Sequence, residues 1–262
     1  MINENSEGGN IINPEKFMEI MPEFKAWSGL ALVKIFDDSG SKIKPLGSGG
    51  LVNYKGRYFV VTNEHVVRSV PKGNRAIYIN IPYADKDAID RKMIVINDAE
   101  NKDNDLAAFE ISEETVNKMN EKSFLSEENY DLDIEDYIND ISNVIFVHGY
   151  AVYDTQIDHM EKTIDMVTTP YQTTVAEYDQ YAEILNIHSN QEGISEYGEE
   201  IEVSTFSGMS GSLVFGLYME PGGIDYKAIG ILSEWEKSES KLLVFPFKDI
   251  TNFLDESFFS DN

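Results

Sequence analysis

The spacing of hydrophobic and polar positions changes twice along the chain and divides it into a helical start, a long strand-rich part and a helical end. Near the start, four apolar residues recur at helical spacing: Phe17, Ile20, Met21 and Phe24. Asn13 and Pro14 precede them and are typical of a helix cap and first turn. Pro22 falls inside the pattern and predicts a disturbance there. We therefore expect a short helical extension over residues 1–26.

From residue 27 on, the apolar residues form short runs that are rich in β-branched and aromatic side chains and end at Gly, Asn, Asp or Pro. In the run 76–81, isoleucine occupies every second position from 77, as one buried face of a strand requires. The runs before residue 112 predict strands at 30–36, 50–54, 58–62, 76–81, 93–96 and 106–111. Those after residue 141 predict strands at 143–148, 163–168, 173–178, 182–187, 201–205, 211–219, 226–233 and 242–246.

Residues 112–141 interrupt this strand pattern. Ser112 predicts the cap of a short helix that carries Val116 and Met119, and an acidic stretch follows it. We interpret 112–141 as a connector between two strand-rich units.

These two units cover residues 27–111 and 142–246. After them, five apolar residues return to helical spacing: Phe247, Ile250, Phe253, Leu254 and Phe258. This predicts a C-terminal helix and tail over 247–262. Short strands at regular intervals, without alternating helices, favour an all-β fold built of barrels or sandwiches.

Composition then removes several classes of function. The chain has no cysteine, which excludes disulfides, thiolate catalysis and cysteine-bound metals. Its 47 acidic against 21 basic residues give a net charge of −26, so we expect neither nucleic acid nor membrane among its partners. The first residues lack the basic and apolar run of a secretory signal, and no apolar stretch is long enough to span a membrane. We therefore expect a cytoplasmic protein.

Three strings place reactive side chains at strand boundaries. Thr-Asn-Glu-His-Val ends a predicted strand at His65, and Asp-Leu-Ala begins one at Asp105. Ser-Gly-Met-Ser-Gly sets Ser210 in a turn before another strand. In residues and in order, these strings resemble the histidine, aspartate and serine segments of the trypsin/chymotrypsin-like serine peptidases. A fourth string, 228–233, is similar to the strand of that family along which substrate pairs.

The resemblance covers about residues 27–257 and is to bacterial trypsin-like and HtrA-like protease domains. Only 16 residues follow Pro246, which leaves no room here for the PDZ domain of HtrA proteins. It implies a chymotrypsin-like double β-barrel and serine endopeptidase activity. His65, Asp105 and Ser210 would form the catalytic triad, and the backbone N–H groups of Gly208 and Ser210 would form the oxyanion hole.

The resemblance also implies where substrate is bound. Ser204 matches the floor of the primary pocket and is neutral, which disfavours a basic side chain there. Ser233 and Trp235 match substrate-contacting positions, and an indole at 235 would narrow the pocket entrance. We expect a preference for small or medium apolar side chains. Met209 stands where zymogens of the family carry an aspartate, so activity should need no cleavage at the N-terminus.

No cofactor and no metal is implied, and the expected partners are a protein or peptide substrate and, in addition, a regulatory protein. Two other functions stay open: a catalytically silent trypsin-like fold that acts as a binding module or scaffold, and a serine esterase.

The string Asp131-x-Asp133-x-Glu135 fails the EF-hand pattern because Asp136 and Ser142 replace its glycine and final glutamate, but a calcium loop of another type stays open. The other histidines, His148, His159 and His188, have no partners at ligand spacing and are interpreted as structural or surface residues.

Overall fold

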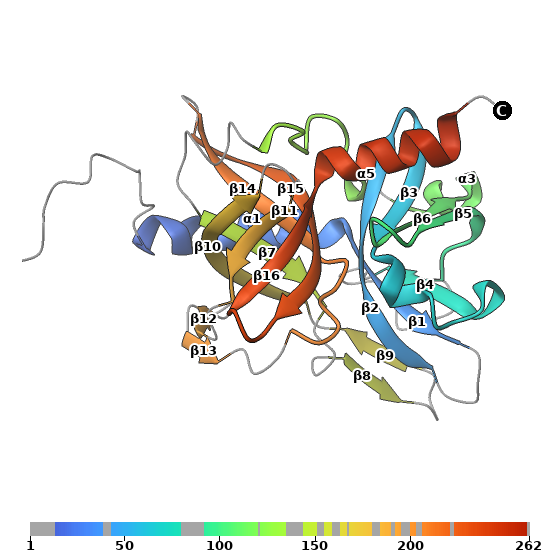
Figure 1. Ribbon diagram of the computed structural model, residues 1–262, viewed down its shortest axis with the longest axis horizontal. Coiled ribbons are helices and arrows are strands. Elements are labelled where there is room, and N and C mark those ends of the chain that lie inside the picture. The colour runs from blue at the N-terminus through green and yellow to red at the C-terminus, as the bar shows by residue number, and fades with distance from the viewer. Residues whose placement is uncertain are drawn as a thin grey trace, which may run out of the picture.

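The computed structural model describes residues 14–38, 43–79, 92–119, 121–134, 144–150, 155–158, 163–166, 168–179, 184–189, 192–194, 200–202, 206–220 and 223–260. Figure 1 shows two curled antiparallel sheets, with helices at the ends of the chain packed against them. The expected all-β class and the double-barrel architecture, with its N- and C-terminal helices, are confirmed, and this arrangement fits a chymotrypsin-like fold.

The first sheet has the strand order β4-β1-β2-β3-β6-β5. Its strands are β1 Leu32–Asp37, β2 Lys44–Tyr54, β3 Arg57–Thr62, β4 Arg75–Ile79, β5 Val95–Asn101 and β6 Leu106–Ile111. The short helix α2, Glu64–Val67, follows β3, and the 3₁₀ turn η1, Lys72–Asn74, precedes β4. The sheet is curled, so that residues just before β5, at one edge, bond to β4, at the other edge. Tyr78 of β4 forms an antiparallel bridge with Lys92, and Met93 N–H donates to the carbonyl oxygen of Ile77 over 2.9 Å.

One predicted strand of this sheet, 93–96, overlaps the observed strand only at its last two residues. The strand β5 begins at Val95 and reaches Asn101, and its pairs with β6 continue through residues 97–101, which are polar except for Ala99. Ile96 is 61% exposed, and Ile94 and Val95 are also exposed. The apolar run covers only the exposed start of this edge strand, and hydrophobicity did not indicate the rest of it.

The second sheet closes into a barrel with the order β10-β11-β16-β15-β14-β7. Its strands are β7 Val144–Gly149, β10 Thr169–Asp179, β11 Ile184–His188, β14 Leu213–Glu220, β15 Gly223–Glu236 and β16 Lys241–Pro246. Two further antiparallel pairs join β8, Thr155–Asp158, to β9, Thr163–Met166, and β12, Glu192–Ile194, to β13, Glu200–Glu202. The barrel interior is apolar and includes Ile145, Val147, Leu185, Val214 and Val244.

The N-terminal helix α1 spans Pro14–Leu30 and is longer than the sequence pattern indicated. It continues through Pro22, which we expected to disturb it. Packing explains the extension: Phe24 contacts the rings of Phe146 and Phe215, with centroids 4.9 and 5.3 Å apart, and Trp27 contacts Phe215 at 5.5 Å. These aromatic contacts with the second barrel outweigh the helix hydrogen bond that a proline removes.

The connector is held by both sheets. Its helix α3, Glu113–Val116, is capped as predicted by Ser112, whose hydroxyl accepts from Thr115 N–H over 3.2 Å. After the 3₁₀ turn η3, Glu121–Ser123, Leu125 exchanges backbone hydrogen bonds with β2, and residues 129 and 131 exchange them with Ala228 of β15. The connector thus pairs with each sheet in turn.

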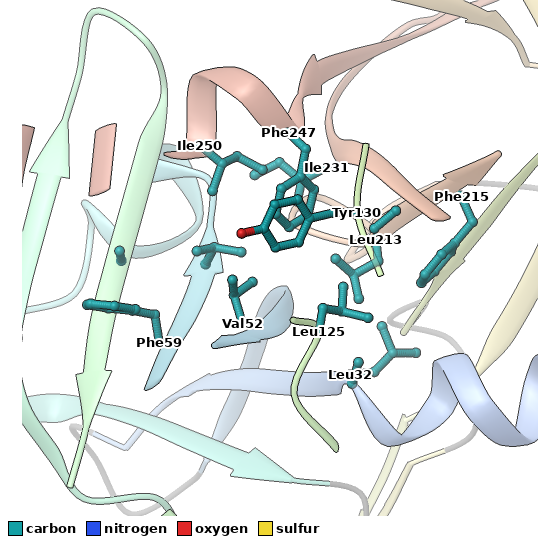
Figure 2. Packing of buried hydrophobic residues seen from close by; sticks show 14 of the residues in the cluster. Leu32, Val52, Phe59, Leu125, Tyr130, Leu213, Phe215, Ile231, Phe247 and Ile250 are labelled. Atoms are coloured by element: carbon teal, nitrogen blue, oxygen red, sulfur yellow. The ribbon is translucent and has the colours of Figure 1, made fainter. Parts of the chain in front are cut away.

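The C-terminal helix α5, Phe247–Leu254, starts at the second barrel and continues as a π-helical turn, η5, Asp255–Phe259, over the first sheet (Figure 1). Phe247 stacks on Tyr130 of the connector at 4.4 Å, and Phe258 lies 4.9 Å from Phe59 of β3. Figure 2 shows the resulting core, in which Val52 of the first sheet and Leu213 of the second meet around the connector residues Leu125 and Tyr130. The two barrels therefore share one apolar cluster.

Candidate functional site

Two of the predicted site residues, His65 and Asp105, are joined directly. His65 lies in α2, directly after β3, and Asp105 precedes β6, the neighbour of β3 in the sheet. The ring atom Nδ1 of His65 is 2.7 Å from Oδ2 of Asp105, and the backbone N–H of His65 donates to Oδ1 over 2.9 Å. The carboxylate therefore holds both the ring and the backbone of the histidine.

The backbone of Asp105 is held by the residues that precede His65. Its φ of 46° lies in the left-handed region, which aspartate tolerates better than most residues. Its carbonyl oxygen accepts from the N–H of Glu64 over 3.1 Å and from the side-chain amide of Asn63 over 3.3 Å. Sequence reasoning did not single out Asn63, although it lies beside His65 in the same string.

A third donor reaches Asp105 from the other barrel. The hydroxyl of Ser233, on β15, donates to Oδ2 of Asp105 over 2.9 Å. Burial alone would raise the pKa of the Asp105 carboxyl, but the hydrogen bonds from His65 and Ser233 outweigh it and hold that pKa below its usual value. Asp105 is therefore ionised at neutral pH and can only accept, which assigns the proton of the neutral His65 ring to Nδ1 and leaves Nε2 as a base.

Ser210 lies in the loop between residues 206 and 212, and the first sheet holds this loop. The carbonyl oxygen of Ser210 accepts from Ser48 N–H of β2 over 2.8 Å. A Cβ on Gly47 would come within 2.7 Å of the side chain of Val66 and 3.0 Å of that same carbonyl. The absence of a side chain at Gly47 therefore lets the loop of Ser210 approach the helix that carries His65.

The amide groups of this loop alternate between bonded and open. Met209 N–H donates to Phe206 over 3.0 Å, and Gly211 N–H donates to Leu232 of β15 over 2.8 Å. The N–H groups of Gly208 and Ser210, which alternate with these, have no acceptor among the described residues. Gly208 has a φ of 86°, a conformation that glycine adopts without a Cβ penalty. The loop thus presents two open donors on either side of Met209, which is itself fully buried.

One contact expected of a triad is not formed. Within the described residues, no hydrogen bond joins the hydroxyl of Ser210 to the ring of His65. Such bonds are often long in enzymes without substrate and tighten only in the complex.

The three residues predicted to contact substrate differ in what the structure shows of them. Ser204 lies outside the described residues. Ser233 contacts Asp105, a contact that the sequence did not predict. Trp235 is half-buried, packs edge-on against Phe206 with ring centroids 5.3 Å apart, and donates from its indole N–H to Ser189 over 3.2 Å. Because Phe206 belongs to the Ser210 loop, this pair of rings borders that loop.

Lys34, Ser48 and Tyr150 form a polar group beside the Ser210 loop that sequence reasoning missed. All three side chains are fully buried where the two barrels meet. Lys34 lies among four buried apolar residues of β1, a position where lysine is seldom found. That unusual placement was the only sign of this polar group in the sequence, but a single lysine in an apolar run does not show which residues it bonds to.

In the part of the chain that the structure describes, the remaining histidines and acids do not gather into a further site. His148 is fully buried: its Nδ1 donates to Ser28 of α1 over 2.7 Å, because the Ser28 hydroxyl itself donates to Phe24. His188 is exposed, and His159 lies outside the described residues. Among the residues that the structure describes, no cluster of three or more His, Asp or Glu is arranged to hold a metal ion. Glu135, the third acid of the possible calcium loop, is outside them.

No helix in the described part of the chain is both long and apolar enough to cross a membrane. Searches against protein-family models and against curated protein sequences find no match to this chain.

Proposed function

We propose that this protein is a serine endopeptidase in which Ser210 is the nucleophile, His65 the general base and Asp105 the group that orients His65. The observation that carries the proposal is the Asp105 carboxylate, which accepts from the ring and the backbone of His65 and from Ser233 of the other barrel. This arrangement fixes one tautomer of a histidine beside a loop that carries a serine and two open amide donors. The order of the three residues along the chain supports the same reaction class.

In the proposed reaction, Nε2 of His65 removes the proton from the Ser210 hydroxyl as its oxygen attacks the carbonyl carbon of the peptide. The carbon–nitrogen bond then breaks, and His65 returns the proton to the leaving amine. Water attacks the resulting acyl-enzyme by the reverse sequence and frees Ser210. The contact between His65 and Ser210 would close when substrate is bound.

The open amides of Gly208 and Ser210 would form the oxyanion hole of the proposed reaction. Negative charge develops on the carbonyl oxygen in the transition state, and donors fixed in advance stabilise it without reorganising. In this loop the neighbouring N–H groups, at Met209 and Gly211, are committed to protein acceptors, whereas these two have none among the described residues. Asp105, for its part, stabilises the positive charge that His65 acquires.

We further propose that the side chain next to the cleaved bond is small or of medium size and apolar. The Trp235 and Phe206 rings support this because they occupy space beside the Ser210 loop and offer an apolar surface. Neither ring provides a charge to pair with a basic or acidic side chain. The indole N–H donates to Ser189, so moving the ring away would break this hydrogen bond.

A mixed peptide library tests the activity and the preference together. The wild-type protein should cleave peptides after small or medium apolar residues, and Ser210→Ala and His65→Ala should abolish cleavage. Ser207→Ala, an exposed serine of the same loop, is the matched control and should cleave like the wild type. Turnover of esters without any turnover of peptides would replace the peptidase by a serine esterase. No turnover of either would favour a binding module.

A further inference from the structure

The hydroxyl of Ser48 joins the first sheet to the loop of the proposed nucleophile. It accepts from the backbone N–H of Tyr150 over 2.9 Å and donates to the carbonyl oxygen of Gly208 over 3.0 Å. Its second possible acceptor, the Tyr150 carbonyl, lies at 3.5 Å. The incoming N–H bond and the shorter distance direct the single hydroxyl proton of Ser48 toward Gly208.

Ser48 contacts the loop at two of its peptide groups. The hydroxyl holds the Gly208–Met209 peptide by its oxygen, and the N–H of that peptide donates to Phe206. The backbone N–H of Ser48 holds the Ser210–Gly211 peptide by its oxygen, and the N–H of that peptide donates to Leu232. Both peptide planes are therefore held at each end, and the peptide between them carries the open N–H of Ser210.

Lys34 holds Tyr150, the residue whose N–H donates to the Ser48 hydroxyl. Its ammonium group donates to the carbonyl oxygen of Tyr150 over 2.7 Å and lies 5.7 Å from the centre of the Tyr150 ring. Lys34 is also the direct cross-strand neighbour of Ser48 in the pairing of β1 with β2. A fully buried ammonium makes strong hydrogen bonds, and removing its partner is costly. Tyr150 is thereby kept where its N–H reaches Ser48.

We propose that Ser48 is a positioning residue, kept in place by Lys34 and Tyr150, that sets the loop of residues 208–211 so that the Gly208 and Ser210 amides remain open to an oxyanion. This inference rests on the proposed function for its catalytic consequence, but the positioning itself is a property of the fold. Ser48 does not touch the reacting atoms. Its loss should lower the stabilisation of the transition state and leave substrate binding nearly unchanged.

The test compares Ser48→Ala with Ser48→Thr, which keeps the hydroxyl and suits a strand, and with Ser28→Ala, which removes a buried hydroxyl that bonds to Phe24 and His148 and not to the loop. With a cleaved peptide as substrate, Ser48→Ala should lower kcat about 10- to 100-fold with KM within about twofold, as the loss of a supporting hydrogen bond typically does. Ser48→Thr should restore most of kcat, and Ser28→Ala should retain it.

A second measurement decides the positioning independently of activity. Hydrogen exchange at the Met209 and Gly211 amides, which the fold protects, should be at least about tenfold faster in Ser48→Ala, with the Val60 amide of β3 as an unchanged reference. Unchanged exchange, or an equal change at Val60, would overturn the proposal. So would an unaltered kcat. If the wild type shows no turnover, the proposed function fails, and exchange alone decides whether Ser48 sets the loop.

Discussion

Ser233 donates a hydrogen bond from its hydroxyl to Oδ2 of Asp105 over 2.9 Å, and this bond joins a strand of the second barrel to an acid of the first. The same oxygen lies 2.7 Å from Nδ1 of His65. The position of the acid therefore depends on how the two barrels dock, and the proposed catalytic group is complete only when both are folded.

We expect Ser233→Ala to weaken the protein by about 1 kcal/mol near neutral pH, a value reduced for partial exposure of the carboxylate. The pKa of Asp105 is lower in the folded protein than in the unfolded chain. This stabilisation is therefore fully present at a pH above the pKa of the unfolded chain, and it is lost as the pH falls through the pKa of the folded protein. The stability gap to wild type should thus close below about pH 4. Urea unfolding between acidic and neutral pH measures it. Ser189→Ala, which loses a bond between neutral groups, should show a gap independent of pH.

Asp105→Asn should fold and be nearly inactive. Asparagine tolerates the left-handed backbone at this position, where φ is 46°. Its amide would donate to His65 and select the wrong tautomer, a change that lowers kcat about 10⁴-fold in serine peptidases with this triad. Asp105→Ala should lose activity and also about 1–2 kcal/mol of stability from backbone strain. Peptide turnover and thermal unfolding separate the two effects. A fully active Asp105→Asn would remove Asp105 from the proposed mechanism.

Gly211→Ala should be far more disruptive than Gly56→Ala. Both glycines have a positive φ, 82° and 77°, so the backbone strain of about 1–2 kcal/mol is common to both substitutions. A Cβ on Gly211 would also overlap the carbonyl oxygen of Ser48 and the hydroxyl of Thr62, whereas nothing lies within 4 Å of one on Gly56. The difference between the two variants, measured by chemical unfolding, isolates the overlap. Equal losses would mean that the loop and β2 are not packed as described.

Acid should weaken the contact between α1 and the second barrel through His148. Burial, and to a lesser extent Lys25, lowers the pKa of His148 to about 3. The unfolded chain therefore binds the proton more readily, and stability falls as pH drops from about 6.5 toward 3, by at most about 1.4 kcal/mol per unit. His148→Gln cannot titrate, and its unfolding free energy should depend less on pH across this window. A difference between the two proteins that stays constant with pH would contradict this.

The sequence predicted the parts of the fold that follow local rules. The strand Leu106–Ile111 matches the predicted run, and the cap at Ser112 matches its predicted helix. Both depend on neighbouring residues alone. The pairing of His65 with Asp105 was predicted from a resemblance, and the structure brings these two residues together.

Features that depend on distant contacts were missed. The run at Ile94–Ile96 is apolar but exposed at an edge, and β5 takes in only its last two residues before it continues through mostly polar ones, so hydrophobicity alone placed this strand too early. Helix α1 continues through Pro22 because aromatic residues of the second barrel pack against it. Nothing in the string around Ser48 shows that its hydroxyl meets Gly208, which is 160 residues away.

The most direct test of the proposed function is labelling with a fluorophosphonate, which reacts with activated serines, followed by peptide mapping of the modified residue. The account predicts one adduct, on Ser210, with no labelling of Ser210→Ala or His65→Ala and normal labelling of Ser207→Ala. Labelling of another serine, or none in a folded wild-type protein, would contradict the assignment of Ser210 as a nucleophile activated by His65.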